Sequence, residues 1–111
     1  LLQQALLNIV LNAEQAIAAA GGRIETKTSV REHKGARHVV VEIRDTGAGI
    51  APSAMPRIFE PFYTTKEVGK GTGLGLAITY GIIQEHGGQI VASNHPDGGA
   101  VFTVQLPVEP G

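Results

Sequence analysis

Residues 69–76 read GKGTGLGL and place four glycines at the start of a stretch with helical periodicity. Glycine at this density lets a backbone approach a ligand closely, and phosphate is a common ligand of such loops. The segment is neither a Walker loop, because Gly71 follows Lys70, nor a dinucleotide fingerprint or a protein-kinase glycine loop, because the third glycine is missing from the required spacing. A helix that begins here would direct free amide groups and the positive end of its dipole toward the loop. The segment therefore indicates a phosphate site at a helix N-terminus, and the alternative is a flexible linker.

Hydrophobic periodicity on both sides of this segment predicts the other elements. We expect helices over residues 2–20 and 72–88, a short helical turn near residues 53–58, and strands over residues 23–33, 38–45, 89–94 and 100–107. This order predicts an α+β fold, a two-layer sandwich in which helices cover one face of a mixed, mostly antiparallel sheet. The 27 residues from 45 to 71 form a long loop of the kind that serves as a lid or binding loop.

The composition excludes several classes of function. The chain has 111 residues, 42% of them hydrophobic, a formal net charge of −1 and no cysteine. Disulfides, zinc–thiolate sites and cysteine catalysis are therefore excluded, and nothing in the charge pattern supports a nucleic-acid partner. Without a long apolar run or a signal-peptide pattern, we expect a cytoplasmic domain that makes no direct contact with a membrane. We interpret residues 1–111 as one domain of a longer protein, because the chain starts inside a helix without a capping residue.

Two asparagines on the first helix are candidate ligands. Asn8 and Asn12 lie about 40° apart on a helix and are flanked by Gln4 and Gln15. Their amide oxygens suit a hard cation such as Mg²⁺, which takes few protein ligands and completes its octahedron with phosphate and water. The alternative is an ordinary polar helix face.

Asp45 is the second candidate, because alternation places it at the end of an inward-facing strand row that includes Ile43. A buried carboxylate needs hydrogen-bond donors. It is either a structural turn residue or an acceptor for the exocyclic amino group of adenine. In the second case, Gly47 and Gly49 would let the backbone fold tightly around the site, and the apolar side chain of Ile50 would pack against the adenine ring.

The long loop supplies the third candidate group. Phe59 and Phe62 border it, and Lys66 and Lys70 place positive charge inside it. Because residues 71–75 lead directly into the second helix, this charge suits a phosphate-binding lid.

The three groups together resemble the ATP-binding catalytic domain of sensor histidine kinases, in the superfamily shared with DNA gyrase, the ninety-kilodalton heat-shock chaperone and mismatch-repair ATPases. LLNIVLNAEQAI (residues 6–17) is similar to the N box of that family, DTGAGI (45–50) to its first glycine box, IFEPFYTTK (58–66) to its F box, and GTGLGL (71–76) to its second glycine box. HGGQI (86–90) and GGAVFTVQLP (98–107) resemble the family's ending. The resemblance covers nearly the whole chain.

The resemblance implies the Bergerat sandwich fold and a site for ATP and Mg²⁺. It assigns Asn12 to the metal, Asn8 to the nucleotide side of the metal site, and Asp45 to adenine. The other ATP-binding residues that it implies are Gln15, Gly47, Gly49, Ile50, Lys66, Lys70, Gly71, Thr72, Gly73, Leu74 and Gly75.

The resemblance also separates a kinase from an ATPase. Hydrolytic members of the superfamily carry a glutamate base four residues before the metal-binding asparagine, and here that position is Asn8, which cannot take a proton at neutral pH. We expect the chain to hold ATP for a histidine on a separate helical hairpin domain of the same protein, which passes the phosphoryl group to a response regulator. None of the four histidines (His33, His38, His86 and His95) has the sequence context of the acceptor. The alternative is a nucleotide-dependent binding module without transfer activity.

Overall fold

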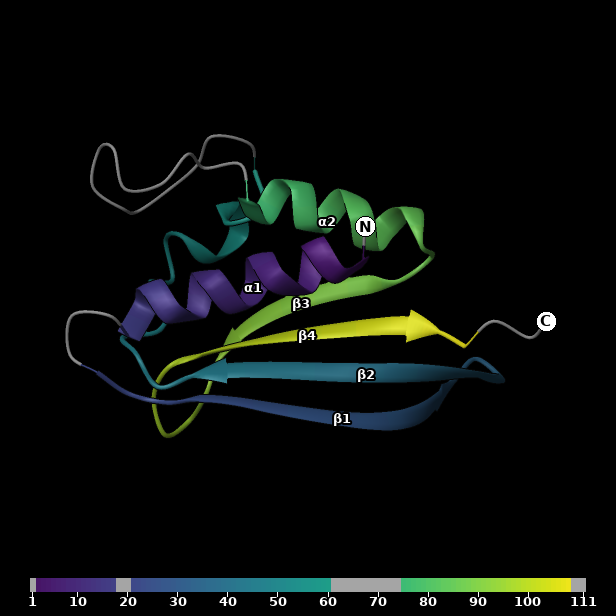
Figure 1. Ribbon diagram of the computed structural model, residues 1–111, viewed down its shortest axis with the longest axis horizontal. Helices are drawn as coiled ribbons and strands as arrows, with labels where there is room; N and C mark the ends of the chain where they lie inside the picture. The colour runs from purple at the N-terminus through teal and green to yellow at the C-terminus, as the bar shows by residue number, and fades with distance from the viewer. Residues whose placement is uncertain (1, 18–20, 61–74, 109–111) are drawn as a thin grey trace.

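The computed structural model describes residues 2–17, 21–60 and 75–108, and in this part of the chain two helices pack on one face of a four-stranded sheet (Figure 1). The elements are α1 (Leu2–Ile17), β1 (Ile24–His33), β2 (Ala36–Asp45), the 3₁₀ turn η1 (Met55–Arg57), α2 (Gly75–Glu85), β3 (Gln89–Asn94) and β4 (Ala100–Pro107). The predicted two-layer α+β sandwich is confirmed, and each expected helix and strand has its counterpart. None of the described helices is long and apolar enough to cross a membrane.

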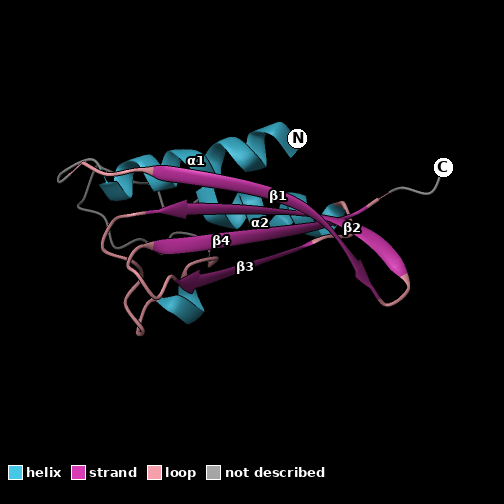
Figure 2. Ribbon diagram, turned by 90° about the horizontal axis from the view of Figure 1, so that it is seen from below, coloured by secondary structure: helices cyan, strands magenta, loops and turns pink. Residues whose placement is uncertain are grey.

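The strand order is β1-β2-β4-β3, and every pairing among the described strands is antiparallel (Figure 2). The expected mixed sheet would need a parallel pair. β3 does run parallel to β2, but β4 turns back from β3 and lies between them. As a result, the described part of the sheet contains antiparallel pairs only.

A tight turn joins β1 to β2. Lys34 and Gly35 both have positive φ, 53° and 78°. Two consecutive left-handed residues match the twist of a β-hairpin, and glycine takes the second position at little steric cost. The turn sets the register that pairs Ile24 with Asp45 at the other end of the hairpin.

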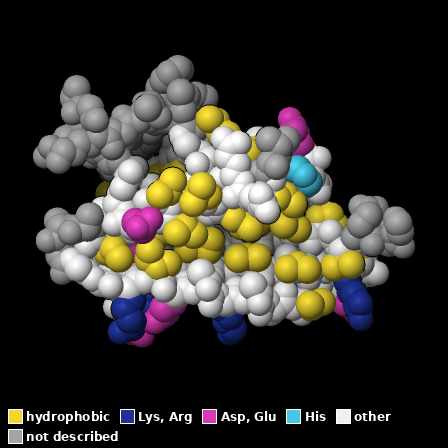
Figure 3. Space-filling model, viewed as in Figure 1, with side chains coloured by type: hydrophobic (Ala, Val, Ile, Leu, Met, Phe, Trp, Pro, Cys, Tyr) yellow, Lys and Arg dark blue, Asp and Glu magenta, His cyan; other side chains and the backbone are white. Residues whose placement is uncertain are grey.

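The core lies between the helices and the sheet. Figure 3 shows hydrophobic side chains along this border, whereas the lysines and arginines visible in the same view project from the opposite side of the sheet. Small residues on α1 let this helix approach the strands closely. The buried cluster contains Ala5 and Ile9 from α1, Ile82 and Ile83 from α2, Ile43 from β2, Ile90 from β3, and Ala100, Phe102 and Val104 from β4.

The segment after β2 returns the chain to the helical layer. The predicted helical turn near residues 53–58 is confirmed as η1. Phe59 follows it and packs on Tyr80 of α2, with ring centroids 5.4 Å apart, and edge-on against Phe102 of β4 at 6.3 Å. The aromatic contacts therefore anchor the last described residues of this segment between α2 and the sheet.

Candidate functional site

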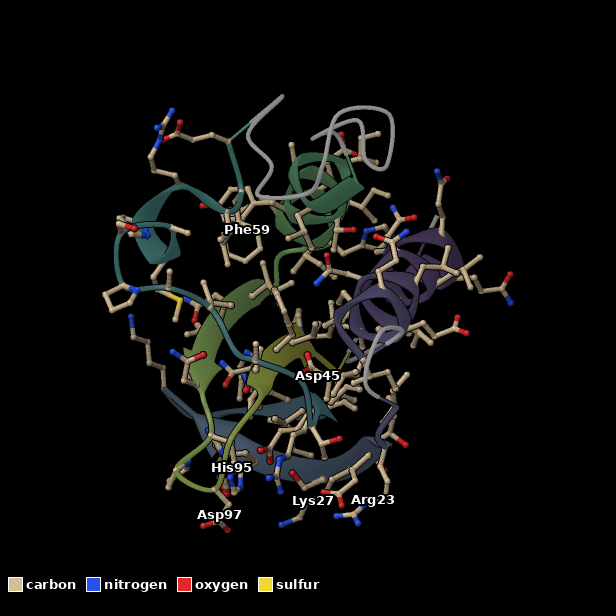
Figure 4. The ribbon with its side chains drawn as sticks, turned by 90° about the vertical axis from the view of Figure 1, so that its left-hand side faces the viewer. Arg23, Lys27, Asp45, Phe59, His95 and Asp97 are labelled. Atoms are coloured by element: carbon tan, nitrogen blue, oxygen red, sulfur yellow. The ribbon has the colours of Figure 1, made fainter. Side chains whose placement is uncertain are left out.

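Asp45 ends β2 and is only 2% exposed. Its Oδ1 atom accepts hydrogen bonds from the backbone amides of Gly47, at 2.9 Å, and Ala100, at 3.3 Å. No described residue donates a hydrogen bond to Oδ2. Figure 4 shows Asp45 on the inner side of the sheet, below the helices, whereas Lys27, His95 and Asp97 lie away from it. The carboxylate is therefore fixed through one oxygen and offers the other as an acceptor.

The loop from residue 46 to residue 50 runs beside the last turn of α1. The amide of Thr46 donates to the carbonyl of Arg23 at 3.1 Å, and the amide of Arg23 donates to Thr46 Oγ1 at 2.8 Å. A Cβ atom on Gly47 would lie 2.6 Å from the carbonyl oxygen of Ala16. Gly47 is therefore required for the close approach of loop and helix.

Ile50, the predicted wall of the site, is half-buried and packs against the core cluster. Both of its backbone groups bond to the side chain of Asn94, at the end of β3. Gly49 has a φ of +82°, and a Cβ atom there would lie 2.8 Å from Asn94 Oδ1. No local pattern in the sequence points to Asn94, because its partner is 44 residues away.

Ala100 was also missed, although its amide binds Asp45. The glycine pair 98–99 lies in the turn between β3 and β4. That pair could have indicated a close backbone approach, because a Cβ atom on Gly99 would overlap the carbonyl oxygen of Asp45.

Asn8 connects α1 to the start of α2. Its Nδ2 atom lies 3.5 Å from the carbonyl oxygen of Gly75, which also accepts a 2.9 Å bond from Thr79 Oγ1. Asn8 and Asn12 are half-buried, and Gln15 is exposed. The structure therefore brings Asn8 to the first residue of α2.

The described residues contain no group of three or more histidine, cysteine, aspartate or glutamate side chains that could hold a metal ion. An amide oxygen such as that of Asn12 is a type of ligand that Mg²⁺ accepts, with phosphate and water completing its octahedral shell. The assignment of Asn12 to the metal stays a prediction.

Part of the predicted site lies outside the described residues, so its assignment stays a prediction. This part comprises Phe62, Lys66, Lys70, Gly71, Thr72, Gly73 and Leu74.

The four histidines lie in or beside turns. His33 and His38 flank the β1–β2 turn, and His95 lies in the β3–β4 turn. His86 follows α2, and its Nδ1 atom lies 2.8 Å from the carbonyl oxygen of Ile82, so it can cap the helix end. None of the four lies within a described helix.

A scan of protein families matches residues 1–110 to the family of histidine kinase-, DNA gyrase B-, and HSP90-like ATPases. Among curated proteins, the chain is similar to the sensor histidine kinase ZraS of Salmonella typhi, with 46% identity over 107 residues that cover 96% of this chain and 22% of ZraS. It is also similar to the sensor kinase CckA of Brucella abortus, with 41% identity over 116 residues that cover 95% of this chain. The chain spans only 12% of the length of CckA and 22% of the length of ZraS.

Solved structures show the same fold. The mycobacterial sensor histidine kinase MprB matches with a TM-score of 0.74 and 28% identity, over 97% of this chain and 70% of that one. Full-length ShkA, solved in complex with AMPPNP, matches with a TM-score of 0.73 and 35% identity, over 96% of this chain and 21% of ShkA. The fold and the family match agree: this chain belongs to the histidine kinase-, DNA gyrase B-, and HSP90-like ATPase family, and its relatives are sensor histidine kinases.

Proposed function

We propose that this domain binds Mg-ATP and donates the γ-phosphoryl group to a histidine on a separate acceptor domain of the same protein, for relay to an aspartate of a response regulator. The observation that carries the proposal is the buried carboxylate of Asp45, which is held through Oδ1 and presents Oδ2. The family match and the similarity to ShkA, solved with AMPPNP, support a nucleotide as the ligand.

Asp45 suits adenine. A carboxylate is an acceptor only at neutral pH, and the exocyclic amino group of adenine is a donor. Guanine carries a carbonyl oxygen at the equivalent position, which would face the carboxylate with no proton between them. Ile50 provides an apolar surface for the ring, and Gly47 and Gly49 keep the loop free of side chains.

The phosphate end of the site lies between α1 and the start of α2. The first amides of an α-helix have no partner within the helix and favour an anion, so the start of α2 suits a phosphate group. Asn12 would hold Mg²⁺, and Asn8 lies beside it toward Gly75. We assign Lys66, Lys70 and residues 71–74 to phosphate contacts, and Gln15 to the outer edge of the site.

The reaction is an in-line phosphoryl transfer. A histidine nitrogen attacks the γ-phosphorus, the bond to the bridging oxygen breaks, and ADP leaves. Bound Mg²⁺ neutralises charge on the phosphates. The residues of this chain hold and orient ATP, and Asn8 cannot act as a base for water. ATP therefore persists until the acceptor histidine is in place. The acceptor domain and the response regulator imply a cytoplasmic location.

The test mixes this chain with the separately produced acceptor domain of the full-length protein and radiolabelled ATP. We expect the label on the acceptor domain, none on this chain, and only trace hydrolysis when this chain is alone. Asn12→Ala should abolish labelling, whereas Gln84→Ala, an exposed change on α2, is the matched control. Nucleotide binding without labelling would instead favour a binding module, and rapid hydrolysis by this chain alone would refute the kinase assignment.

A further inference from the structure

The loop that carries Ile50 is fixed at its far end by one side chain. Asn94 Oδ1 accepts a hydrogen bond from the amide of Ile50 at 2.7 Å, and Asn94 Nδ2 donates to the carbonyl of Ile50 at 2.8 Å. The side-chain amide thus binds both backbone groups of one residue, as the backbone of a neighbouring strand would. Because the two bonds share one rigid group, they fix the orientation of Ile50 as well as its position.

Asn94 pairs with Ala100 across the β3–β4 hairpin. The amide of Ala100 donates to Asp45 Oδ1, at 3.3 Å. One cross-strand pair therefore holds Ile50 through Asn94 and Asp45 through Ala100. The carboxylate and the apolar wall of the candidate base site are set relative to each other by the end of this hairpin.

The chemistry of asparagine is needed for this arrangement. Serine or threonine carries a single oxygen and cannot span both groups of Ile50, and aspartate has no donor for the carbonyl at neutral pH. Gly49 contributes by lacking a side chain, because a Cβ atom there would lie 2.8 Å from Asn94 Oδ1. Asn94 is exposed, so its role does not come from burial in the core.

We infer that Asn94 is a positioning residue of the nucleotide site, which sets the spacing between Asp45 and Ile50 for a purine ring. This inference rests on the proposed function. Asn94 acts through Ile50, so removal of the Asn94 side chain frees the loop that holds Ile50 beside the purine ring. The phosphate end of the site, on α1 and α2, stays unchanged.

The experiment compares Asn94→Ala with Ser93→Ala, an exposed change on the same strand. Calorimetry measures the affinity for ADP with magnesium, well below the unfolding temperature. Two hydrogen bonds of ordinary net strength correspond to a loss of roughly 30-fold. We expect that loss for Asn94→Ala and no change for Ser93→Ala. With the acceptor domain and labelled ATP, KM for ATP should rise by the same factor while kcat stays constant.

Asn94→Asp separates the two bonds. It keeps the acceptor for the amide of Ile50 and places a second oxygen against the carbonyl. Amide hydrogen exchange of Ile50 should accelerate in Asn94→Ala and stay protected in Asn94→Asp, while both variants bind ADP more weakly than the wild type.

The outcomes distinguish the inference from the function on which it rests. Wild-type ADP affinity in both Asn94 variants would overturn the role of Asn94 alone, and so would a fall in kcat at constant KM. A wild-type chain that binds no ADP would refute the proposed nucleotide site itself. Binding of ADP without phosphotransfer would refute the proposed kinase activity, and the ADP affinities of the variants would still decide the role of Asn94.

Discussion

Replacement of Gly99 with alanine tests the packing of the β3–β4 turn against Asp45. Gly99 has a φ of +87°, and a Cβ atom there would overlap the carbonyl oxygen of Asp45. An L-residue in this conformation costs about 1–2 kcal/mol. Since the carbonyl belongs to a paired strand, the turn itself must move away.

Movement of the turn stretches two hydrogen bonds. The amide of Ala100 donates to Asp45 Oδ1 at 3.3 Å, and the amide of His95 donates to the carbonyl of Gly99 at 2.8 Å. A bond to a charged acceptor contributes about 1.5–3 kcal/mol and a neutral bond about 1 kcal/mol. With the backbone strain, we expect Gly99→Ala to lower the free energy of unfolding by about 3.5–6 kcal/mol.

Gly98→Ala is the matched control. Gly98 also has a positive φ, +106°, but a Cβ atom there would meet no atom within 4 Å. This variant should lose only the conformational part, about 1–2 kcal/mol. Thermal unfolding followed by circular dichroism should therefore place the midpoint of Gly99→Ala about 10 °C below that of Gly98→Ala. Equal midpoints for the two variants would refute the close packing of the turn on Asp45.

Three further stability predictions, one in the loop after β2 and two in α2, are checked by urea unfolding. Gly47→Ala should lower the free energy of unfolding by about 2–3 kcal/mol, because its Cβ atom would lie 2.6 Å from the carbonyl oxygen of Ala16. Gly81→Ala should raise the free energy of unfolding by about 0.5–1 kcal/mol, because Gly81 lies inside α2 and a Cβ atom there meets open space. Thr79→Val keeps the shape of a fully buried side chain and removes its hydrogen bond to the carbonyl of Gly75, so it should lower the free energy of unfolding by about 1 kcal/mol. A decrease of more than about 3 kcal/mol would contradict this account.

The elements were predictable because their periodicities are local. Alternation in β2 placed Asp45 on the inner face, and the structure buries it there. Val30 lies on the same face of β1 as Ile24, yet its side chain is 65% exposed. The tip of the β1–β2 hairpin extends beyond α1 and α2, so neither of these helices covers that end of the strand (Figure 1).

The contacts that complete the site were not predictable, because they join distant segments. Asn94 and Ile50 are 44 residues apart, and Ala100 and Asp45 are 55 apart. A side chain that bonds to remote backbone leaves no periodic pattern around itself. The position of β4 between β2 and β3 likewise depends on long-range pairing, which single-strand periodicity does not encode.

Recognition of adenine by Asp45 is the central claim, and calorimetric titration with Mg-ATP and Mg-GTP tests it most directly. The wild-type chain should bind ATP and bind GTP far more weakly. Asp45→Asn keeps an acceptor for the amides of Gly47 and Ala100 and turns the second oxygen into a donor, so the fold should persist. The lost charge-assisted bond corresponds to roughly a 10- to 100-fold loss of ATP affinity. Equal affinities for ATP and GTP, or an Asp45→Asn variant that binds ATP like the wild type, would contradict the account.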